Sequence, residues 1–500
     1  MKEKPDDLHS LKTTAFFVGG AGIYKFFDSL SGIDKCLTLV GTTGVLTIAG
    51  FYAWDHYSKS GRDKKKRIEQ LKTVPLCLLQ KNTVGVWLGT DLELLTRIFL
   101  PDFIRLRHLH LLGATGSGKT ESVILNMIQQ DTARGVGSII VDGKGDSSFL
   151  RELEATVPTH KLKVFDLGSE MSLAYNPLET GTPLEAAQRL LSSLTWTEEY
   201  YKSKANATLQ QLFQIHFKKC GKNPTLTELS AYLETPLSYA AVTFTENYPK
   251  KMAEADFMEL SGLRDQVRSL CIAHLAKILS PNHGSGINLK DAEKGTVIYF
   301  RLQSLMSPQL VSTLGKLIIN HLSYLAGLAQ RNDSDKNTKR PFVPVYFDEF
   351  ASFACPEFAD LISKARSAGY ALTFSHQSTG DVAEVSKGFL SQITDNSATK
   401  IVMRINDPDS ADFFARTFGT KVVQKITQRI TNAKDMDTGE AVGEGSQRQT
   451  HQFRAEPDVF KTLPTGVGAV LIAHGEDTSQ GASHVFRIKF PKLQRKENAK

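Results

Sequence analysis

The hydrophobic residues of this chain follow two different patterns along its length. Near the amino terminus they form two long stretches with few charges, at 11–27 and 36–54. From about residue 107 onward, short apolar runs rich in β-branched residues alternate with longer segments of helical periodicity. Apolar runs that are continuous rather than alternating are typical of parallel strands covered on both faces. The pattern after residue 107 therefore predicts an α/β fold with a mostly parallel sheet.

The strands disappear from the pattern in one internal region. Between the runs AYNPLE and GTVIYF the chain keeps only helical texture, as in the segment TLQQLFQIHFKKC. Thr225 and Glu228 have the spacing of a capping box, which marks the start of a helix. We therefore expect an all-α domain at 181–280, inserted into an α/β domain formed by 68–180 and 281–490.

Three smaller segments predict surface structure. The run TVGVWLGTDLE, 83–93, predicts a short β-hairpin. The polar stretch 431–452 predicts a loop or a mobile hairpin, and 491–500 a flexible tail. In 420–429, TKVVQKITQR, basic residues alternate with apolar ones. This alternation favours a strand with a solvated face over a non-specific grip on nucleic-acid phosphates.

The amino-terminal stretches have the length and the flanks of membrane helices. Residues 36–54 are nineteen residues without a charge, enough to cross the hydrocarbon core. The following segment, 58–67, carries six basic residues and one acidic residue, which predicts a cytoplasmic location. We expect a transmembrane hairpin within 1–67, with both ends in the cytoplasm. The alternatives are a single span with 11–27 lying on the membrane surface, or a buried core helix.

Composition narrows the class of protein only slightly. The chain has 500 residues, of which 41% are hydrophobic and 23% charged, as in an ordinary globular protein of two to four domains. Its net charge of +7 is mildly basic and hints at an acidic partner. The five cysteines form no CxxC pair and no cluster with zinc spacing. These cysteines argue against a disulfide framework and for a reducing compartment.

The segment GATGSGKT fits the phosphate-binding loop pattern G-x-x-x-x-G-K-[ST]. The apolar run LHLL precedes it and a helical pattern follows, which is the required strand–loop–helix context. Backbone N–H groups of such a loop surround the nucleotide phosphates at a helix amino terminus. Lys119 would reach the β and γ oxygens, and the Thr120 hydroxyl would bind Mg²⁺. The residues predicted to bind nucleotide are Gly113, Ala114, Thr115, Gly116, Ser117, Gly118, Lys119 and Thr120.

A nucleotide-hydrolysing site also needs a carboxylate on an adjacent strand and a group that activates water. The run VPVYFDEF supplies both, because four apolar or aromatic residues lead into Asp348 and Glu349. We expect Asp348 to hold Mg²⁺ through water and Glu349 to polarise the attacking water. Taken alone, this run would be an ordinary strand end. Together with the phosphate loop, it favours hydrolysis over transfer to a small molecule.

Further candidates lie around two other strands. YALTFSHQS ends in polar residues, and Gln377 at its tip is placed to contact the γ-phosphate. Arg366, on the helical segment before this strand, could enter a neighbouring subunit's site as an arginine finger or form a surface salt bridge. The segment VDGKGD puts Asp142, Lys144 and Asp146 at the end of another strand, facing the nucleotide cleft.

The order and spacing of these motifs resemble those of the TraD/TraG coupling proteins of conjugation and type IV secretion. The segments that carry the resemblance are RHLHLLGATGSGKT, IIVDGKGD, FDLGSEMSLAYNPL, VPVYFDEF, KARSAGYALTFSHQS and TKIVMRINDPDSADFFARTFGT. The resemblance covers most of the chain, to about Ile472. It implies an inner-membrane anchor, a RecA/FtsK-like P-loop ATPase domain and an all-α domain facing the cytoplasm. It also implies ATP and Mg²⁺ as cofactors and a homo-hexamer with sites at subunit interfaces.

The resemblance gives each candidate residue a role. Lys119 and Thr120 match the Walker A lysine and threonine, and Asp348 and Glu349 match the Walker B pair. Gln377 matches the sensor, and Arg366 matches the arginine finger. Two departures stand out. The second-strand motif is Asp-Gly-Lys here but often Asp-Pro-Lys in relatives, which leaves its nucleotide contact open. The sequence also ends soon after the motor, which leaves substrate recruitment to the helical domain or to other proteins.

The leading hypothesis is a coupling ATPase in the bacterial inner membrane. It would be multi-pass, with most of the chain in the cytoplasm, and would feed single-stranded DNA with bound relaxase into the channel proteins of a type IV system. The alternatives are delivery of protein effectors by the same motor and an FtsK-like translocase of duplex DNA. A soluble small-molecule kinase and a membrane scaffold with an inactive loop are further options. The membrane anchor and the Asp-Glu pair argue against the kinase.

Overall fold

The structure is a computed structural model. The described residues are 64, 66–79, 84–243, 250–305, 307–331, 340–430, 441–474 and 483–491. The chain divides into two compact units, Met1–Thr73 and Val74–Lys500, and every element named below belongs to the second unit. The stretches 11–27 and 36–54 predicted to cross the membrane lie outside the described residues. Within the described ranges, no helix has the length and hydrophobicity needed to cross a membrane.

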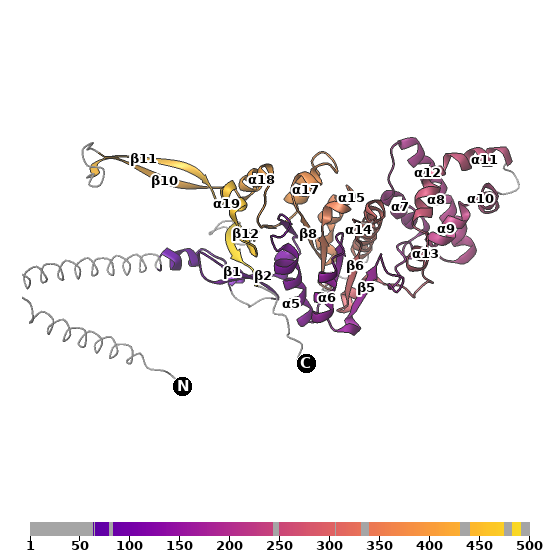
Figure 1. Cartoon of the computed structure of the whole chain (residues 1–500), viewed down its shortest axis with the longest axis horizontal. Coiled ribbons are helices and arrows are strands. Elements are labelled where there is room, and N and C mark those ends of the chain that lie inside the picture. The colour runs from indigo at the N-terminus through magenta and orange to yellow at the C-terminus, as the bar shows by residue number, and fades with distance from the viewer. Residues whose placement is uncertain are drawn as a thin grey trace, which may run out of the picture. The chain divides into compact units, whose positions relative to one another are not determined.

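A large sheet forms the centre of the second unit (Figure 1). Its eleven strands run in the order β2-β1-β13-β12-β9-β3-β8-β7-β4-β6-β5. The strands from β9 to β5 are parallel to one another, and β12, β13, β1 and β2 extend the sheet as antiparallel neighbours. The bounds are β1 Gly85–Asp91, β2 Arg97–Pro101, β3 Leu109–Leu112, β4 Ser138–Asp142, β5 Leu162–Asp166, β6 Val297–Arg301, β7 Val343–Asp348, β8 Tyr370–His376, β9 Thr399–Val402, β12 Val467–Ala473 and β13 Ser483–Lys489.

The predicted α/β architecture with a mostly parallel sheet is confirmed for the strands that carry the nucleotide motifs. The prediction of a mostly parallel sheet left room for antiparallel strands, and β12 pairs antiparallel with both β9 and β13. One detail differs from the prediction. The hairpin predicted at 83–93 is wrong in its bounds. That run forms β1 and the beginning of a turn, and the partner strand β2 begins at Arg97.

Helices cover both faces of the parallel strands. Along β4, Ile139 and Val141 belong to one hydrophobic cluster and Ile140 to the other, because successive side chains point to opposite faces. On the Ile140 side, the cluster includes side chains of α5 and α6, and on the other side those of α14, α15 and α17. The bounds are α5 Leu125–Ala133, α6 Ser147–Thr156, α14 Pro308–Arg331, α15 Glu357–Lys364, α16 Gly380–Ala383, α17 Phe389–Asp395, α18 Pro408–Phe418 and α19 Pro457–Thr462, with the short helices α3 Leu76–Leu79 and α4 Asp102–Arg105.

The chain between β5 and β6 is helical wherever it forms a described element. Its helices gather at the β5 end of the sheet (Figure 1). Both predicted capping residues of the box at Thr225 and Glu228 make the expected reciprocal hydrogen bonds. These helices share one hydrophobic cluster with the adjoining face of the sheet, so their core is continuous with it. The domain boundaries given above stay predictions. The helices are α7 Pro183–Ser193, α8 Glu199–Cys220, α9 Leu226–Tyr232, α10 Pro236–Thr243, α11 Lys250–Glu259, α12 Ser261–Ser269 and α13 His274–Leu279.

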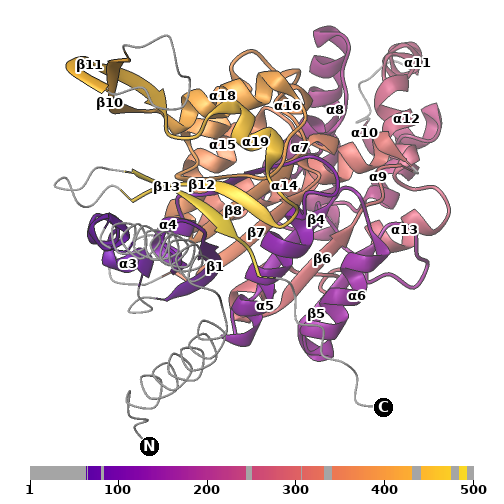
Figure 2. The same ribbon diagram turned by 60° about the vertical axis from the view of Figure 1, so that its left-hand side comes forward.

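A two-stranded ribbon extends from the sheet region next to α18 (Figures 1 and 2). It consists of β10 Thr420–Ile430 and β11 Ala441–Phe453, paired antiparallel from Thr420 opposite Phe453. The basic and apolar alternation of 420–429 therefore does belong to a strand, as predicted. The neighbouring polar stretch forms the second strand, β11, from Ala441 onward, with a register shift at Gln428 and Arg429. Residues 431–440 lie outside the described residues.

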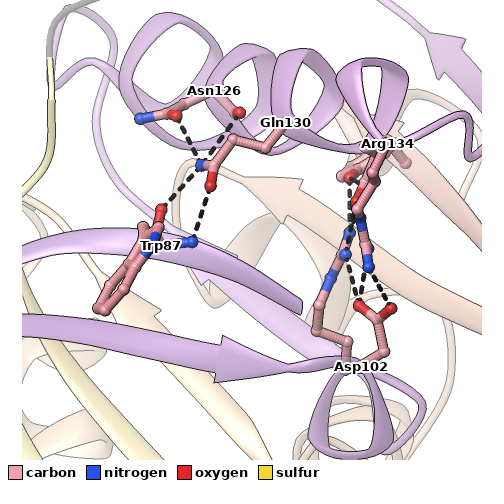
Figure 3. Close-up of polar contacts among 8 residues, drawn as sticks. Trp87, Asp102, Asn126, Gln130 and Arg134 are labelled. Carbon is pink, nitrogen blue, oxygen red and sulfur yellow. Dashed lines mark hydrogen bonds and ion pairs between the residues drawn. The ribbon is translucent and has the colours of Figure 1, made fainter. Parts of the chain in front are cut away.

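The helix that follows the phosphate loop is bound to the β1–β2 hairpin (Figure 3). The Gln130 side chain accepts a hydrogen bond from the Trp87 N–H at 2.8 Å and donates one to the Trp87 carbonyl at 2.9 Å. One turn further on, the Arg134 guanidinium makes two hydrogen bonds to the Asp102 carboxylate, at 2.6 and 2.8 Å. These contacts fix the carboxyl end of α5 against the hairpin and against α4, to which Asp102 belongs.

A buried ion network continues this contact into the sheet. Asp131, which is only 1% exposed, accepts two hydrogen bonds from Arg105, at 2.9 and 2.6 Å, and one from the Tyr346 hydroxyl at 3.0 Å. Burial tends to raise the pKa of Asp131, but the two neighbouring arginines, Arg105 and Arg134, hold it below its ordinary value. The carboxylate is therefore ionised and fully paired at neutral pH.

We expect Asp131→Asn to lower the free energy of unfolding by about 3 kcal/mol, because it removes the bidentate partner of the buried Arg105 and leaves it only the single carboxylate contact to Asp102 at 3.0 Å. Denaturant-induced unfolding followed by circular dichroism measures this change. The matched control is Asp458→Asn, which removes a 90%-exposed partner of Lys461 and should cost less than about 1 kcal/mol. Equal effects of the two substitutions would contradict a stabilising role for the network.

Candidate functional site

The predicted phosphate loop lies at the carboxyl edge of the parallel strands. It follows β3 directly and leads into a turn of π-helix, Lys119–Ile124, and then into α5. Gly116 and Gly118 have φ values of 75° and 99°, in the left-handed region that only glycine adopts easily. The Gly113 N–H donates to the carbonyl of His376, at the end of β8. The loop therefore has the backbone shape that its glycines predicted.

Lys119 lies inside this loop and not in solvent. Its side chain is 8% exposed, and its ammonium group donates to the carbonyl of Gly113. Burial lowers the pKa of Lys119, while the nearby carboxylates of Glu349 and Asp348 oppose that shift. An ammonium held over its own loop by a single carbonyl has donors left for phosphate oxygens.

Asp348 is the point at which three segments of the site meet. Its carboxylate accepts a hydrogen bond from the Thr120 hydroxyl at 2.6 Å, one from the Ser375 hydroxyl and one from the Glu349 N–H at 3.1 Å. The predicted metal residues Thr120 and Asp348 are thus in direct contact across 228 residues of sequence. Ser375 was not among the predicted site residues, although its position near the end of YALTFSHQS is the signal that could have identified it.

Gln377 joins the loop to the second predicted carboxylate. Its amide nitrogen donates to Glu349, and its amide oxygen accepts from the Thr115 hydroxyl at 2.9 Å. Glu349 itself has φ of 52°, an uncommon conformation for a residue with a side chain, which turns the chain sharply after β7. The structure therefore brings together the loop, Asp348, Glu349 and Gln377 in one connected set of contacts.

The VDGKGD segment supplies a further carboxylate beside this set. Asp142 lies opposite Asp348 on the adjacent strand and is 1% exposed. Burial, together with the nearby charge of Asp348, raises the pKa of Asp142 to about 6, although the Tyr299 hydroxyl donates to it at 2.7 Å. Lys144 forms an ion pair with Asp146 at 2.9 Å near the surface. This segment thus faces the site, as predicted from the strand order.

The oxygen donors of this site fit a magnesium ion bound together with a nucleotide. Nowhere in the described ranges do three or more histidine, cysteine or acidic side chains form a cluster that could hold a metal by themselves. Mg²⁺ usually binds one or two protein oxygens and completes its octahedron with phosphate oxygens and water. The hydroxyl of Thr120 and the carboxylate of Asp348, already in contact, are donors of this kind.

Arg366 is the one predicted site residue that the structure does not bring to this set. It lies in a 3₁₀ turn, Ala365–Ala368, before the first residue of β8, whereas Gln377 follows the last. Seven strand residues separate the two ends, or roughly 20 Å. Arg366 therefore lies at the amino edge of the sheet, exposed, beside a cavity of about 310 Å³.

Two buried histidines behind the loop were not predicted as part of the site. The Nε2 atoms of His110 and His376 lie 2.6 Å apart, and Nδ1 of His376 lies 2.7 Å from the Ser378 carbonyl. Since a carbonyl only accepts, His376 donates through Nδ1 and accepts through Nε2. Burial lowers the pKa of His376 to about 4 and that of His110 well below its ordinary value. Both rings are therefore neutral in the folded chain at neutral pH.

The chain is similar to known coupling proteins. Residues 343–463 match the family model described as the TraM recognition site of TraD and TraG. The type 4 coupling protein DotL of Legionella pneumophila is 23% identical over 393 residues, which cover 64% of this chain. The same alignment covers 50% of DotL, so the chain spans about half the length of this curated relative.

Solved structures share the fold. The unbound bacterial conjugative coupling protein TrwB superposes with a TM-score of 0.61 and 15% identity, over 83% of this chain and 90% of that one. TrwB in complex with ADP and Mg²⁺ gives a TM-score of 0.59 at 15% identity, over 83% of this chain and 92% of that one. VirB4 of Thermoanaerobacter pseudethanolicus gives 0.53 at 15% identity, over 83% and 98%. The resemblance to the TraD/TraG coupling proteins, predicted from the sequence, is confirmed.

The histidine pair makes stability depend on pH in a defined direction. Below pH 6.5 the unfolded chain binds protons on histidine, while the folded chain keeps His376 neutral down to about pH 4. We therefore expect the free energy of unfolding to fall as the pH drops from 6.5 towards 4, by up to about 1.4 kcal/mol per pH unit for each such histidine. Urea unfolding at several pH values gives this slope.

His376→Asn should lower the number of protons taken up on unfolding by about one, and the slope should fall accordingly, whatever the substitution does to stability at pH 7. The control is His160→Asn, which changes an exposed histidine. A slope that is the same in the His376→Asn variant and in the unaltered chain would show that His376 is protonated in the folded state.

Proposed function

We propose that this chain is the coupling ATPase of a type IV secretion or conjugation system, acting in the bacterial inner membrane. The observation that carries the proposal is the continuous set of contacts from Thr115 through Gln377 to Glu349, beside the Thr120–Asp348 contact. It joins a phosphate loop, a metal-binding carboxylate and a water-activating carboxylate within one edge of the sheet. The likeness to DotL and TrwB supports the same function.

The residues of the loop hold the nucleotide in this proposal. Backbone N–H groups of 113–120 surround the phosphates, and Lys119 exchanges its bond to the Gly113 carbonyl for bonds to the β and γ oxygens. Thr120 and Asp348 would hold Mg²⁺ through their hydroxyl and carboxylate oxygens. When bound, the Mg²⁺ nucleotide supplies the phosphoanhydride bond that is cleaved.

Glu349 and Gln377 carry out and sense the hydrolysis. The Glu349 carboxylate takes the proton of the attacking water, which is the role of a general base placed beside the phosphate. Gln377 contacts Glu349 and the loop at once, so its amide position changes when the γ-phosphate is present or absent. Since Gln377 lies at the tip of β8 and Arg366 at its start, the strand joins this site to the opposite edge of the sheet.

The finer parts of the proposal concern assembly and cargo. The chain acts as a homo-hexamer, in which Arg366 reaches the nucleotide of a neighbouring copy. Residues 1–67 anchor it in the lipid as a two-helix hairpin, 68–180 and 281–490 form the motor, and 181–280 form an all-α domain. The cargo is single-stranded DNA with bound relaxase, passed to the channel proteins of the secretion system.

Protein effectors are the second candidate cargo. The matched family model is described as a recognition site for TraM, so residues 343–463 support docking of a partner protein on the motor domain. Stimulation of ATP hydrolysis by single-stranded DNA, but not by duplex DNA, favours the first cargo. Co-purification with effector and adaptor proteins, without stimulation by DNA, favours the second. Stimulation by duplex DNA alone would indicate an FtsK-like translocase.

Lys119→Ala should lower steady-state ATP hydrolysis by at least about 100-fold, because it removes a charge that stabilises the transition state. Phosphate release from the full chain, with and without single-stranded DNA, measures this loss. A deletion strain complemented with the variant should also fail to transfer its element. The control is Lys387→Ala, which removes an exposed lysine outside the site. Undiminished hydrolysis or transfer in Lys119→Ala would contradict the ATPase proposal.

Ser375→Ala should raise the Mg²⁺ concentration for half-maximal hydrolysis by about 10-fold, because Ser375 holds one oxygen of Asp348 in place. A Mg²⁺ titration of ATP hydrolysis at saturating nucleotide measures the shift. Ser378→Ala is the matched control, since Ser378 bonds to Asp381 and not to Asp348. An unchanged Mg²⁺ requirement in Ser375→Ala would contradict a role for Ser375 in positioning the metal-binding carboxylate of Asp348.

A further inference from the structure

A groove runs between the helices α7 and α14, which lie side by side (Figures 1 and 2). It holds a cavity of about 530 Å³, and every residue that lines this cavity belongs to one of the two helices. None of them belongs to the nucleotide site described above. Cavities of roughly 300–1,000 Å³ between packed helices are a usual place for small ligands. The groove therefore has the size and the setting of a separate binding site.

A buried arginine lines this cavity. Arg189 is 3% exposed, and its Nη1 donates to the Pro177 carbonyl at 2.7 Å. Its Nε and Nη2 atoms are buried and have no hydrogen-bond partner in the described part of the chain. In the same ranges, no carboxylate oxygen lies within 4.0 Å of its guanidinium nitrogens. Burial lowers the pKa of Arg189, and the neighbouring Tyr175 and Tyr324 oppose that shift. The positive charge is thus buried without a counter-charge, which costs free energy.

The two unpartnered nitrogens share one edge of the planar guanidinium group. Two parallel N–H donors on such an edge match the two oxygens of a carboxylate. Gly181 leaves space beside this edge, because it has no Cβ. An atom at the position of that Cβ would lie 3.4 Å from Nη2 of Arg189, and 3.3 Å from both the Tyr324 ring and the Glu185 carboxylate. Nη2 therefore lies next to two side chains that themselves line the cavity.

The other charged groups of the cavity are already paired. Arg331, which is 70% exposed, forms an ion pair with Glu185 at 3.0 Å. Glu185 also accepts a hydrogen bond from the Thr182 N–H at 2.9 Å, as part of the capping box of α7. These pairs leave Arg189 as the lining charge that lacks an opposite charge. One uncompensated cation favours a ligand with one negative charge.

Apolar side chains make up the walls of the groove. Leu184 of α7 is 50% exposed, and Leu328 and the ring of Tyr324 face it from α14. The ring of Tyr324 also lies 4.8 Å from the guanidinium carbon of Arg189, so the apolar wall and the cation adjoin each other. At Gly327 an added Cβ would meet no atom within 4 Å, which keeps the groove open at this point.

We propose that the groove between α7 and α14 binds a small monocarboxylate with an apolar body, whose carboxylate pairs with Nε and Nη2 of Arg189. The apolar body lies against Tyr324 and Leu328. Both donors are covered in this conformation, so the ligand reaches them by moving the Tyr324 or the Glu185 side chain. A phosphate monoester is the poorer match, because it carries nearly two negative charges and would leave one of them unpaired.

The test measures the binding of three ligands of similar shape to the full chain in detergent: phenylacetate, phenylacetamide and phenethylamine. Phenylacetate should bind with a Kd of about 1 mM or lower. The neutral amide should bind at least about 10-fold more weakly, because it loses the charge-assisted pair, and the cationic amine more weakly still. Ligand-observed NMR titrations give each Kd, with protein-free micelles as the blank. The readout is binding, so it does not depend on ATP hydrolysis.

Two variants remove different parts of the site. Arg189→Met keeps much of the length of the side chain without its charge, and should weaken phenylacetate binding at least about 10-fold. Gly327→Leu fills the groove and should abolish binding of phenylacetate, while a better helix former replaces glycine within α14. The matched control is Arg331→Gln, which removes the exposed cation of the same cavity. It should change the affinity for phenylacetate by less than about 2-fold, since exposed ion pairs contribute little.

Three outcomes would overturn the inference. One is equal affinity for phenylacetate and phenylacetamide, which would show that Arg189 contributes no charge to binding. Another is no binding of phenylacetate up to about 10 mM, and the third is unchanged binding in Gly327→Leu. The unfolding midpoint and ATP hydrolysis of each variant report whether it is folded. If Arg189→Met does not fold, the comparison of the three ligands and the Gly327→Leu variant decide the question.

Discussion

The rest of the site depends on the hydrogen bonds that the carboxylate of Asp348 accepts. This carboxylate sits at the end of β7 and accepts hydrogen bonds from Thr120, which begins the helix after the loop, and from Ser375, near the end of β8. Three separate segments are thereby fixed relative to one another before any ligand arrives. Because Asp348 is nearly buried, these bonds are protected from competition with water, and the loop, the metal-binding oxygens and the Gln377 strand behave as one unit.

Because the central strands are parallel, their carboxyl ends all lie at one edge of the sheet and their amino ends at the other. The polar residues at these two edges differ in charge. At the carboxyl edge lie the acidic residues Asp142, Asp348 and Glu349 around Lys119. At the amino edge lie the cations Arg107, Arg366 and Lys400. An edge rich in carboxylates suits a metal-bound nucleotide, and an edge rich in cations suits bare phosphate oxygens. The two edges thus differ in the sign of the charged residues named here.

Much of the carboxyl edge could be predicted from the sequence, because its residues follow directly after apolar runs. Strand direction places Gly113, Asp142, Asp348 and Gln377 together without further information. The hydrogen-bond partners of those residues could not be predicted as well from the sequence. Ser375 and the His110–His376 pair lie within strands, where only three-dimensional register decides which side chains meet. The antiparallel direction of β12 and β13 was also hidden, since a buried apolar run looks the same in either direction.

The amino edge was predicted least well. Arg366 was recognised by resemblance, but Lys400 looks like an ordinary lysine in TKIVMRI, and its burial follows from packing of β9 against distant segments. Sequence spacing cannot show that a cation has lost its solvent and gained no counter-charge. The same limit applies to Asp131 and Arg105, whose partner Tyr346 lies more than 200 residues away.

The contact between α5 and the β1–β2 hairpin has a mechanical consequence. The amide of Gln130 satisfies both backbone groups of Trp87, which lies in β1 outside the register of β1 with β13, so the helix takes the place of a neighbouring strand at that point. Lys119 and Gln130 belong to one continuous helical segment. Such a segment is stiff along its axis, so a displacement at one end moves the other end as well. A shift of the loop by a fraction of an ångström must therefore either drag the hairpin with it or break these bonds. The β1–β2 hairpin is thus mechanically coupled to the phosphate loop.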